Sequence, residues 1–196
     1  MRWTGRAALG GVLGAGVLAI VASCGGGGGN NQVAVASAPT EAERIARGKY
    51  LTIVGGCIDC HTPGTLYGAQ DTTRELSGSE LGWEGPWGVT YARNLTPDPE
   101  TGLGKYTAQQ IVDAIDSGKR LDGSPMMPPM PWPNYAQMSD EDLQAVAAYL
   151  VSLPPVKHKV PDRLSPGTRA PAALTFPPPP AWDGQNLPPP PGAEAK

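Results

Sequence analysis

The sequence has few of the residues that build a large core or a reactive site. Its 196 residues include one phenylalanine, two histidines and three cysteines. A single phenylalanine does not favour a large conventional core. Glycine and proline are abundant instead, at 26 and 23 residues, with glycine concentrated before residue 30 and proline after residue 120. These biased ends place the compact domain between them.

Basic residues are also scarce. The chain has 15 Lys and Arg against 18 Asp and Glu, and a net charge of −3. The first 23 residues contain Arg2 and Arg6 but no acid, so the remainder carries 13 basic and 18 acidic residues, a net charge of −5. This balance argues against nucleic acid as a partner. It suits electrostatic steering toward a basic patch on a partner protein.

The N-terminal stretch lacks acids and resembles an export signal. Two arginines precede an apolar run from Ala7 to Ala22, which is the arrangement of a secretory signal. The ending Val-Ala-Ser-Cys resembles the lipobox of bacterial lipoproteins, in which the cysteine carries the lipid. We therefore expect residues 1–23 to be a lipoprotein signal peptide, Cys24 to be lipidated, and residues 24–39 to be a flexible tether. An uncleaved membrane helix and an ordinary signal peptide are the alternatives.

The middle of the chain predicts helices, and no strand pattern competes with them. Each predicted helix begins at a hydroxyl residue followed three positions later by an acid or amide, as in a capping box. Apolar residues then recur at helical spacing. The expected helices are 41–54, which ends at Gly55-Gly56, 108–117 and 140–152; their capping pairs are Thr40 with Glu43, Thr107 with Gln110, and Ser139 with Asp142. The fold class expected is all-α.

The connections between these helices are long, about 62–106 and 119–138. A compact helical domain rarely has such loops unless they wrap a ligand. Three short helices with few large apolar residues would also bury too little surface to offset the conformational entropy of the chain. We therefore expect a non-protein group to fill the centre.

The motif Cys57-Ile-Asp-Cys60-His61 identifies that group as haem. Cys-x-x-Cys-His is the attachment signal for c-type haem. The two thiols form thioethers with the porphyrin vinyl groups, and the histidine ligates the iron. A redox disulfide is one alternative, but it requires a βαβ context and the motif here follows a helix. A structural zinc is another, and its fourth ligand would have to be His158.

A sixth iron ligand is expected from the segment "SPMMPPMPWPNY", residues 124–135. Its three methionines, Met126, Met127 and Met130, offer thioether sulfur, which suits haem iron and raises the reduction potential. The prolines around them restrict the backbone, so that one sulfur can be held with little rearrangement. Because only one methionine can ligate, at least two are packing residues.

Several stretches together resemble the class I monohaem cytochromes c, in particular those that serve as electron-transfer subunits of periplasmic dehydrogenases. The similarity runs from about residue 41 to 156 through "ARGKYL", "CIDCHT", "GPWG", "NLTPDPETGLG", "MPPMPWPNY" and "MSDEDLQAVAAYLVSLPPV". The resemblance implies a class I fold, with three main helices and long loops around one covalently bound haem. It also implies that Met130 is the axial ligand, with Met127 second, and that the first and last helices cross at Gly48 near Tyr149.

Other residues receive weaker assignments. We expect Trp83, Trp87 and Trp132 to be walls of the haem pocket. The loop 94–104 is expected to fold against the haem edge, with Asn94 or Arg93 bonded to a haem propionate, rather than to bind calcium. His158 is expected to be solvent-exposed.

The chain is thus expected to comprise the signal, the tether, a cytochrome domain at 40–156 and a Pro-rich tail at 157–196. The tail is expected to be disordered or draped on the surface, with a docking strand anchored by Phe176 and Trp182 as the alternative.

The predicted function is that of a one-electron carrier, anchored by lipid to a membrane on the periplasmic side of the cell envelope. Its partners would be redox proteins, such as a dehydrogenase, an oxidase or another cytochrome. The alternative is a haem enzyme or ligand sensor, similar to a peroxidase, with a displaceable sixth ligand.

Overall fold

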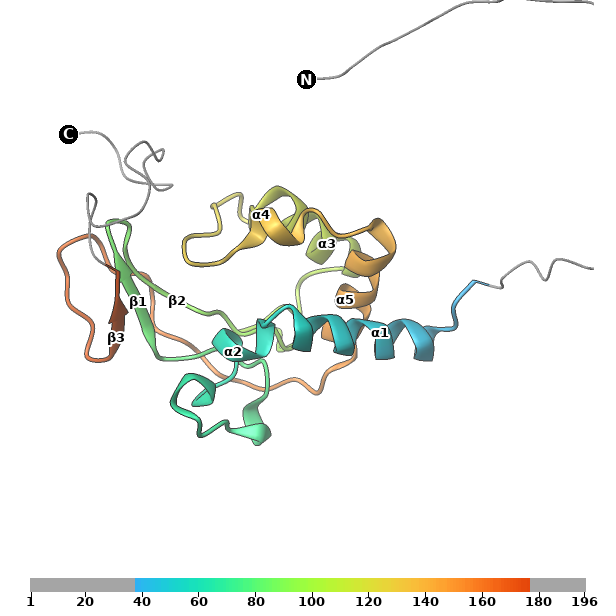
Figure 1. The fold of residues 1–196 in the computed structure, drawn as a ribbon, viewed down its shortest axis with the longest axis horizontal. Coiled ribbons are helices and arrows are strands. Elements are labelled where there is room, and N and C mark those ends of the chain that lie inside the picture. Colours follow the sequence, from blue (N-terminus) through green and yellow to red (C-terminus); the bar gives the residue numbers. More distant parts are fainter. Residues whose placement is uncertain (1–37, 177–196) are drawn as a thin grey trace, which may run out of the picture. The chain divides into compact units, whose positions relative to one another are not determined.

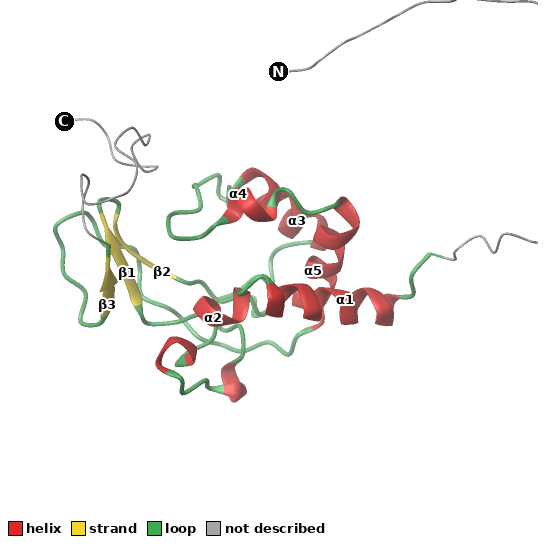
Figure 2. Cartoon of the chain, viewed as in Figure 1, coloured by secondary structure: helices red, strands yellow, loops and turns green. Residues whose placement is uncertain are grey.

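The computed structural model describes residues 38–176. The predicted signal peptide, Cys24, nearly all of the tether and the last 20 residues of the predicted tail lie outside the described residues. The described part contains five α-helices, two 3-10 helices and three short strands. The long helices lie toward one end and the strands at the other (Figures 1 and 2). No helix within residues 38–176 is long and apolar enough to cross a membrane.

Helix α1, Glu41–Val54, has the predicted bounds. The hydroxyl of Thr40 accepts the backbone N–H of Glu43, whose carboxylate accepts the N–H of Thr40, so the capping box is complete. The helix ends at Gly55, and Gly56 follows with φ of 70°. This left-handed residue turns the chain directly into the short helix α2, Cys57–His61.

Helices α3, Ala108–Ser117, and α5, Asp140–Ser152, also have the predicted bounds. The box of α3 is complete, but that of α5 is not. Ser139 accepts the N–H of Asp142, while the Asp142 carboxylate binds Arg47 of α1, with 2.9 Å between Oδ1 and Nε. The third predicted capping box is therefore half formed, and its acid instead links the first and last long helices.

The helical core forms where α1 crosses α5 (Figure 1). A side chain at Gly48 would collide with the carbonyl oxygen of Ala145 and lie 2.8 Å from Cβ of Tyr149. Glycine is therefore required for the backbones to approach this closely. The crossing implied for Gly48 and Tyr149 is present. The buried core around it contains Leu51, Leu76, Ile111, Val112, Leu143, Ala145, Val146, Ala147, Tyr149 and Leu150.

A small sheet corrects the all-α expectation. Strands β1, Gly82–Gly85, and β2, Gly88–Tyr91, form an antiparallel hairpin, and β3, Ala173–Thr175, pairs parallel with β1. The order is β2-β1-β3. The short helix α4, Trp132–Tyr135, adds to the three long helices and α2. The domain is therefore mostly helical with a sheet at one end.

Residues 157–176, assigned from the sequence to the tail, pack on the rest of the described unit. Val160 is buried with Val89 and Tyr91 of β2, and Leu164 forms an antiparallel bridge with Val89. Phe176 lies against both Trp83 and Trp87, with ring centroids 6.1 and 5.7 Å apart. Residues 157–176 therefore pack on β2 and add the strand β3 beside β1.

Candidate haem-binding site

A cavity of about 410 Å³ lies inside the described unit, within the range typical of small-molecule and cofactor sites. Helices α1, α3 and α5 provide apolar walls, among them Leu51, Ile111, Leu143, Val146 and Leu150. These residues also belong to the hydrophobic core. The cavity therefore borders the hydrophobic core.

Helix α2 brings the three residues of the attachment motif to this cavity. Cys57, Cys60 and His61 all line it, and the two cysteines are free thiols. The spacing, the turn at Gly56 and the single helical turn of α2 place them together. This arrangement fits a group fixed at one edge by two thioethers and ligated by the adjacent imidazole.

His61 is held in one orientation by the backbone. Its Nδ1 lies 2.6 Å from the carbonyl oxygen of Arg93, to which it donates a hydrogen bond. Because Nδ1 carries the proton, Nε2 is the nitrogen left to bind iron. Burial lowers the pKa of His61, which favours the neutral imidazole that a metal requires. The histidine therefore fits the role of a haem ligand.

The thiols do not have the character of a redox pair. Burial is the main cause that raises the pKa of Cys57, to about 11, and burial also raises the pKa of Cys60. A redox dithiol needs a lowered pKa to form the attacking thiolate. The raised pKa values of these thiols therefore argue against the redox-disulfide alternative.

The zinc alternative also lacks support. His158 does not join the motif; its Nε2 lies 2.7 Å from Oε1 of Glu80, and its Nδ1 is 2.9 Å from the carbonyl oxygen of Ser77. Within residues 38–176 no group of three or more His, Cys, Asp or Glu side chains is arranged to hold a metal ion. The expectation that His158 is solvent-exposed is wrong: its side chain is 12% exposed, because residues 157–176 fold back onto the 71–80 loop.

The three candidate methionines line the same cavity. Met127 is buried, whereas Met126 and Met130 are partly buried. The segment 124–135 that carries them, called here the methionine segment, lies opposite α2 in the ribbon (Figure 1), and both contribute residues to the cavity lining. Since all three side chains reach the cavity, their burial does not choose among them, and the assignment of Met130 stays a prediction.

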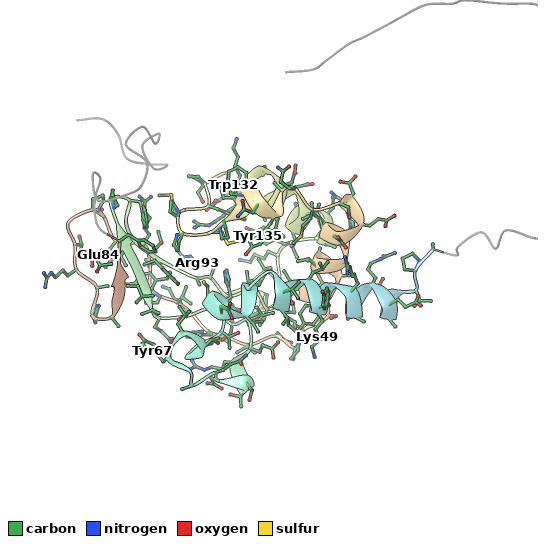
Figure 3. All side chains as sticks on the ribbon, in the orientation of Figure 1. Lys49, Tyr67, Glu84, Arg93, Trp132 and Tyr135 are labelled. Atoms are coloured by element: carbon green, nitrogen blue, oxygen red, sulfur yellow. The ribbon has the colours of Figure 1, made fainter. Side chains whose placement is uncertain are left out.

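Two arginines are the cations of the cavity wall, and one of them was not predicted. Arg93 and Arg120 both line the cavity; Arg93 is labelled in Figure 3. Arg120 is partly buried and donates to the hydroxyl of Ser124 at 3.3 Å, and no ion pair joins it to a carboxylate in the described part of the chain. Burial lowers the pKa of Arg120, and the nearby charge of Arg93 acts in the same direction. An arginine nevertheless stays protonated at neutral pH.

Only some of the other residues predicted to surround the haem have the predicted position. Trp83 lines the cavity, whereas Trp87 packs on Phe176 and Trp132 packs against Gly118 at the end of α3. The side chain of Asn94 is fully used inside the protein. Its amide nitrogen donates to Val156 and Thr101, and its oxygen accepts from Thr96, which makes it a brace for the 94–104 loop. Arg93 therefore remains as the predicted partner of a propionate.

A mostly helical domain with a Cys-x-x-Cys-His turn on the wall of a core cavity defines a c-type haem protein. The chain belongs to the cytochrome c family, whose sequence model matches residues 45–154. Membership implies a covalently bound haem c and electron transfer as the function.

Relatives with known roles agree with this family. The cytochrome c subunit of the quinone alcohol dehydrogenase of Gluconobacter oxydans is 38% identical over 121 residues, covering 60% of this chain and 24% of that protein. The fructose dehydrogenase cytochrome subunit of Gluconobacter japonicus is 35% identical over 135 residues, 68% of this chain and 26% of that protein. The gluconate 2-dehydrogenase cytochrome c subunit of Pantoea cypripedii is 36% identical over 107 residues, 55% and 22% of the two chains.

The matched region thus spans about a quarter of the length of each relative. All three are by name cytochrome subunits of dehydrogenases. This kinship confirms the prediction of an electron-transfer protein rather than a catalytic subunit.

Proposed function

We propose that the chain is a lipid-anchored one-electron carrier with one haem c, attached through Cys57 and Cys60 and ligated by His61 and Met130. The observation that carries this proposal is the 2.6 Å hydrogen bond from His61 Nδ1 to the Arg93 carbonyl, on the wall of a cavity that also contains both cysteines. A histidine held in this way is prepared to bind iron through Nε2.

The bound haem iron supplies the redox chemistry, because it cycles between ferric and ferrous states. The protein supplies the surroundings. Cys57 and Cys60 fix one edge of the group, the Arg93 carbonyl orients His61, and the apolar walls keep water from the site. Low polarity around the iron disfavours the extra charge of the ferric form and so raises the potential.

Arg93 and Arg120 are proposed to pair with the carboxylates of the haem propionates. A partly buried arginine without a carboxylate partner is costly unless a bound anion pairs with it. Within residues 38–176 Arg120 forms no ion pair, although the charge of Asp122 is nearby, and Arg93 lines the same cavity with a 4.0 Å contact to Asp162. Guanidinium groups bind carboxylates well because they can donate two parallel hydrogen bonds.

The ligand assignment can be tested by replacing each methionine. We expect Met130→Ala to keep the covalent haem, bind carbon monoxide in the reduced state and have a lower potential, because thioether sulfur favours ferrous iron. Met127→Ala, the matched control from the same segment, should alter packing only. Potentiometric titration and carbon monoxide binding of both variants decide the matter. Carbon monoxide binding by Met127→Ala alone would assign the ligand to Met127, and binding by neither would place the sixth ligand elsewhere.

The ferric absorption spectrum of the wild type separates the carrier from a haem enzyme or sensor. A wild-type ferric protein with a weak sulfur-to-iron charge-transfer band beyond the visible haem bands has a filled sixth position, which leaves no open site for peroxide or gas chemistry. Absence of this band in the wild type would favour the enzyme.

The proposals of a lipid anchor and of a redox partner rest on the N-terminal sequence and on the relatives, not on the geometry of the site. Cys24 ends the sequence that resembles a lipobox, and the relatives are named as subunits of dehydrogenases. We therefore propose a membrane-tethered protein on the periplasmic side that exchanges electrons with a dehydrogenase or another redox protein. Cells grown with labelled palmitate should incorporate the label into the wild type and not into Cys24→Ala, with the haem spectrum unchanged. Equal labelling of the two proteins would contradict the anchor at Cys24.

A further inference from the structure

The methionine segment, residues 124–135, has an unusual shortage of backbone donors. Prolines occupy positions 125, 128, 129, 131 and 133, so these positions have no N–H. Such a segment can be fastened to its surroundings mainly through its carbonyl oxygens and its side chains. Backbone hydrogen bonds join only its first residues to the preceding chain, from the N–H of Arg120 to the carbonyl of Ser124 at 2.9 Å and from the N–H of Met126 to the carbonyl of Gly118 at 2.7 Å.

The hydroxyls of Thr90 and Tyr135 join the rest of the methionine segment to its surroundings. Thr90 of β2 is buried, and its Oγ1 lies 2.7 Å from the carbonyl oxygen of Pro128; the second acceptor within reach, the Trp83 carbonyl, is 3.5 Å away. The single hydroxyl proton therefore goes to Pro128. This bond joins the sheet to the segment two residues before Met130.

The second fastening lies after Met130. Tyr135, at the end of α4, donates its hydroxyl to the carbonyl oxygen of Gly55 at 2.6 Å. Gly55 caps α1 and stands two residues before Cys57. Tyr135 therefore links the methionine segment directly to the chain that carries the haem-attachment motif, as Figure 3 allows the reader to follow from its labelled side chain toward α1.

Both residues also line the cavity, and along the chain their two bonds lie on either side of Met130. We propose that Thr90 and Tyr135 are positioning residues that hold the methionine segment over the haem and thereby set how readily the sixth ligand leaves. The inference rests on the proposed function, since it requires a methionine of this segment on the iron. The hydroxyl of Thr90 donates to a backbone carbonyl of the segment, and the hydroxyl of Tyr135, a residue of the segment, donates to a backbone carbonyl of α1's cap; neither bond is to a methionine sulfur.

The test is the affinity of the ferric holoprotein for imidazole, which must displace the methionine. Thr90→Val and Tyr135→Phe remove one hydroxyl each and keep the shape of the side chain. Loss of one hydrogen bond should favour the open segment, and so raise the apparent imidazole affinity, by about twofold to tenfold. The double variant should show roughly the product of the two effects because the bonds are separate. Thr90→Ser keeps the hydroxyl and should restore the wild-type affinity.

Two matched variants control for general destabilisation. Thr96→Val loses a buried hydroxyl that donates to Oδ1 of Asn94 at 2.8 Å and accepts the N–H of Val156 at 3.1 Å, and Tyr149→Phe loses a hydroxyl bonded to Glu75 at 3.3 Å; none of these hydrogen bonds reaches the methionine segment. Both should lower the denaturant midpoint and leave imidazole affinity unchanged. Equal imidazole affinity in Thr90→Val, Tyr135→Phe and the wild type would overturn the inference, and so would an equal gain in the two controls. A wild type without the charge-transfer band overturns the proposed ligation itself, which distinguishes the two failures.

Discussion

At the residue scale, the chemistry of the Cys-x-x-Cys-His motif could be predicted from the sequence, but the residues elsewhere in the chain that orient and surround it could not. Cys57, Cys60 and His61 are adjacent, so their spacing alone predicted one shared site, and all three line the cavity. The carbonyl that orients His61 belongs to Arg93, 32 positions away. Arg120 likewise gave no local signal, since a single arginine in a loop is usually solvated. Its place on the cavity wall depends on the tertiary fold.

Arg120 supports a prediction about pH. If it pairs with a haem propionate, it keeps the propionate pKa low, because an opposite charge stabilises the ionised form. Reduction removes a positive charge and raises that pKa, so the potential falls as pH rises between the propionate pKa of the oxidised form and that of the reduced form. Arg120→Gln should move this falling region upward by about one to three pH units, and it should lower the potential at high pH.

The measurement is a series of potentiometric titrations across pH. Lys119→Gln is the matched control, since it removes the same charge at the exposed neighbouring position. It should leave the pH profile in place. Identical profiles for Arg120→Gln and the wild type would show that Arg120 does not pair with a propionate.

At the element scale, the long helices were predictable because their signals are local. A capping hydroxyl, a helical apolar stripe and a terminating glycine or proline lie within the segment itself, and α1, α3 and α5 have the predicted bounds. The capping box of α5 forms only in part: Ser139 accepts the N–H of Asp142 as predicted, but the Asp142 carboxylate does not bond back to the N–H of Ser139. Arg47 competes for this carboxylate through a tertiary contact.

The strands were missed because they lack the patterns that mark strands. β1 reads Gly-Trp-Glu-Gly, and all four residues of β2 are buried, so neither shows the alternation of a half-exposed strand. β3 lies in a Pro-rich region and finds its partner about 90 positions earlier, with Trp83 opposite Leu174. Its pairing depends on the fold of the whole unit. Because residues 157–176 fold back onto the rest of the unit, His158 packs against Glu80, a contact that the amino-acid composition does not predict.

At the scale of the whole molecule, the scarcity of large apolar residues and the cavity both indicate that a bound group completes the hydrophobic core. The sequence argument inferred a missing apolar mass, and the described unit has about 410 Å³ of space whose walls are core residues. Protein interiors are close-packed, so wall atoms around a space of this size need a bound group to complete their contacts. The stability of the three-helix arrangement should therefore depend on the bound haem.

This dependence gives a prediction for the chain without covalent haem. Cys57→Ala combined with Cys60→Ala should abolish haem attachment and leave the domain largely unfolded, because the remaining core buries too little surface to offset the entropy of ordering the chain. Cys24→Ala is the matched control: it removes a cysteine outside the motif and should keep both covalent haem and the native helical signal. Helical circular dichroism of the two proteins, with haem staining after denaturing electrophoresis, measures both properties. A haem-free double variant with native helical intensity and a cooperative thermal transition would show that the polypeptide core is sufficient, and that the cavity is a preformed socket rather than space that the haem must fill for folding.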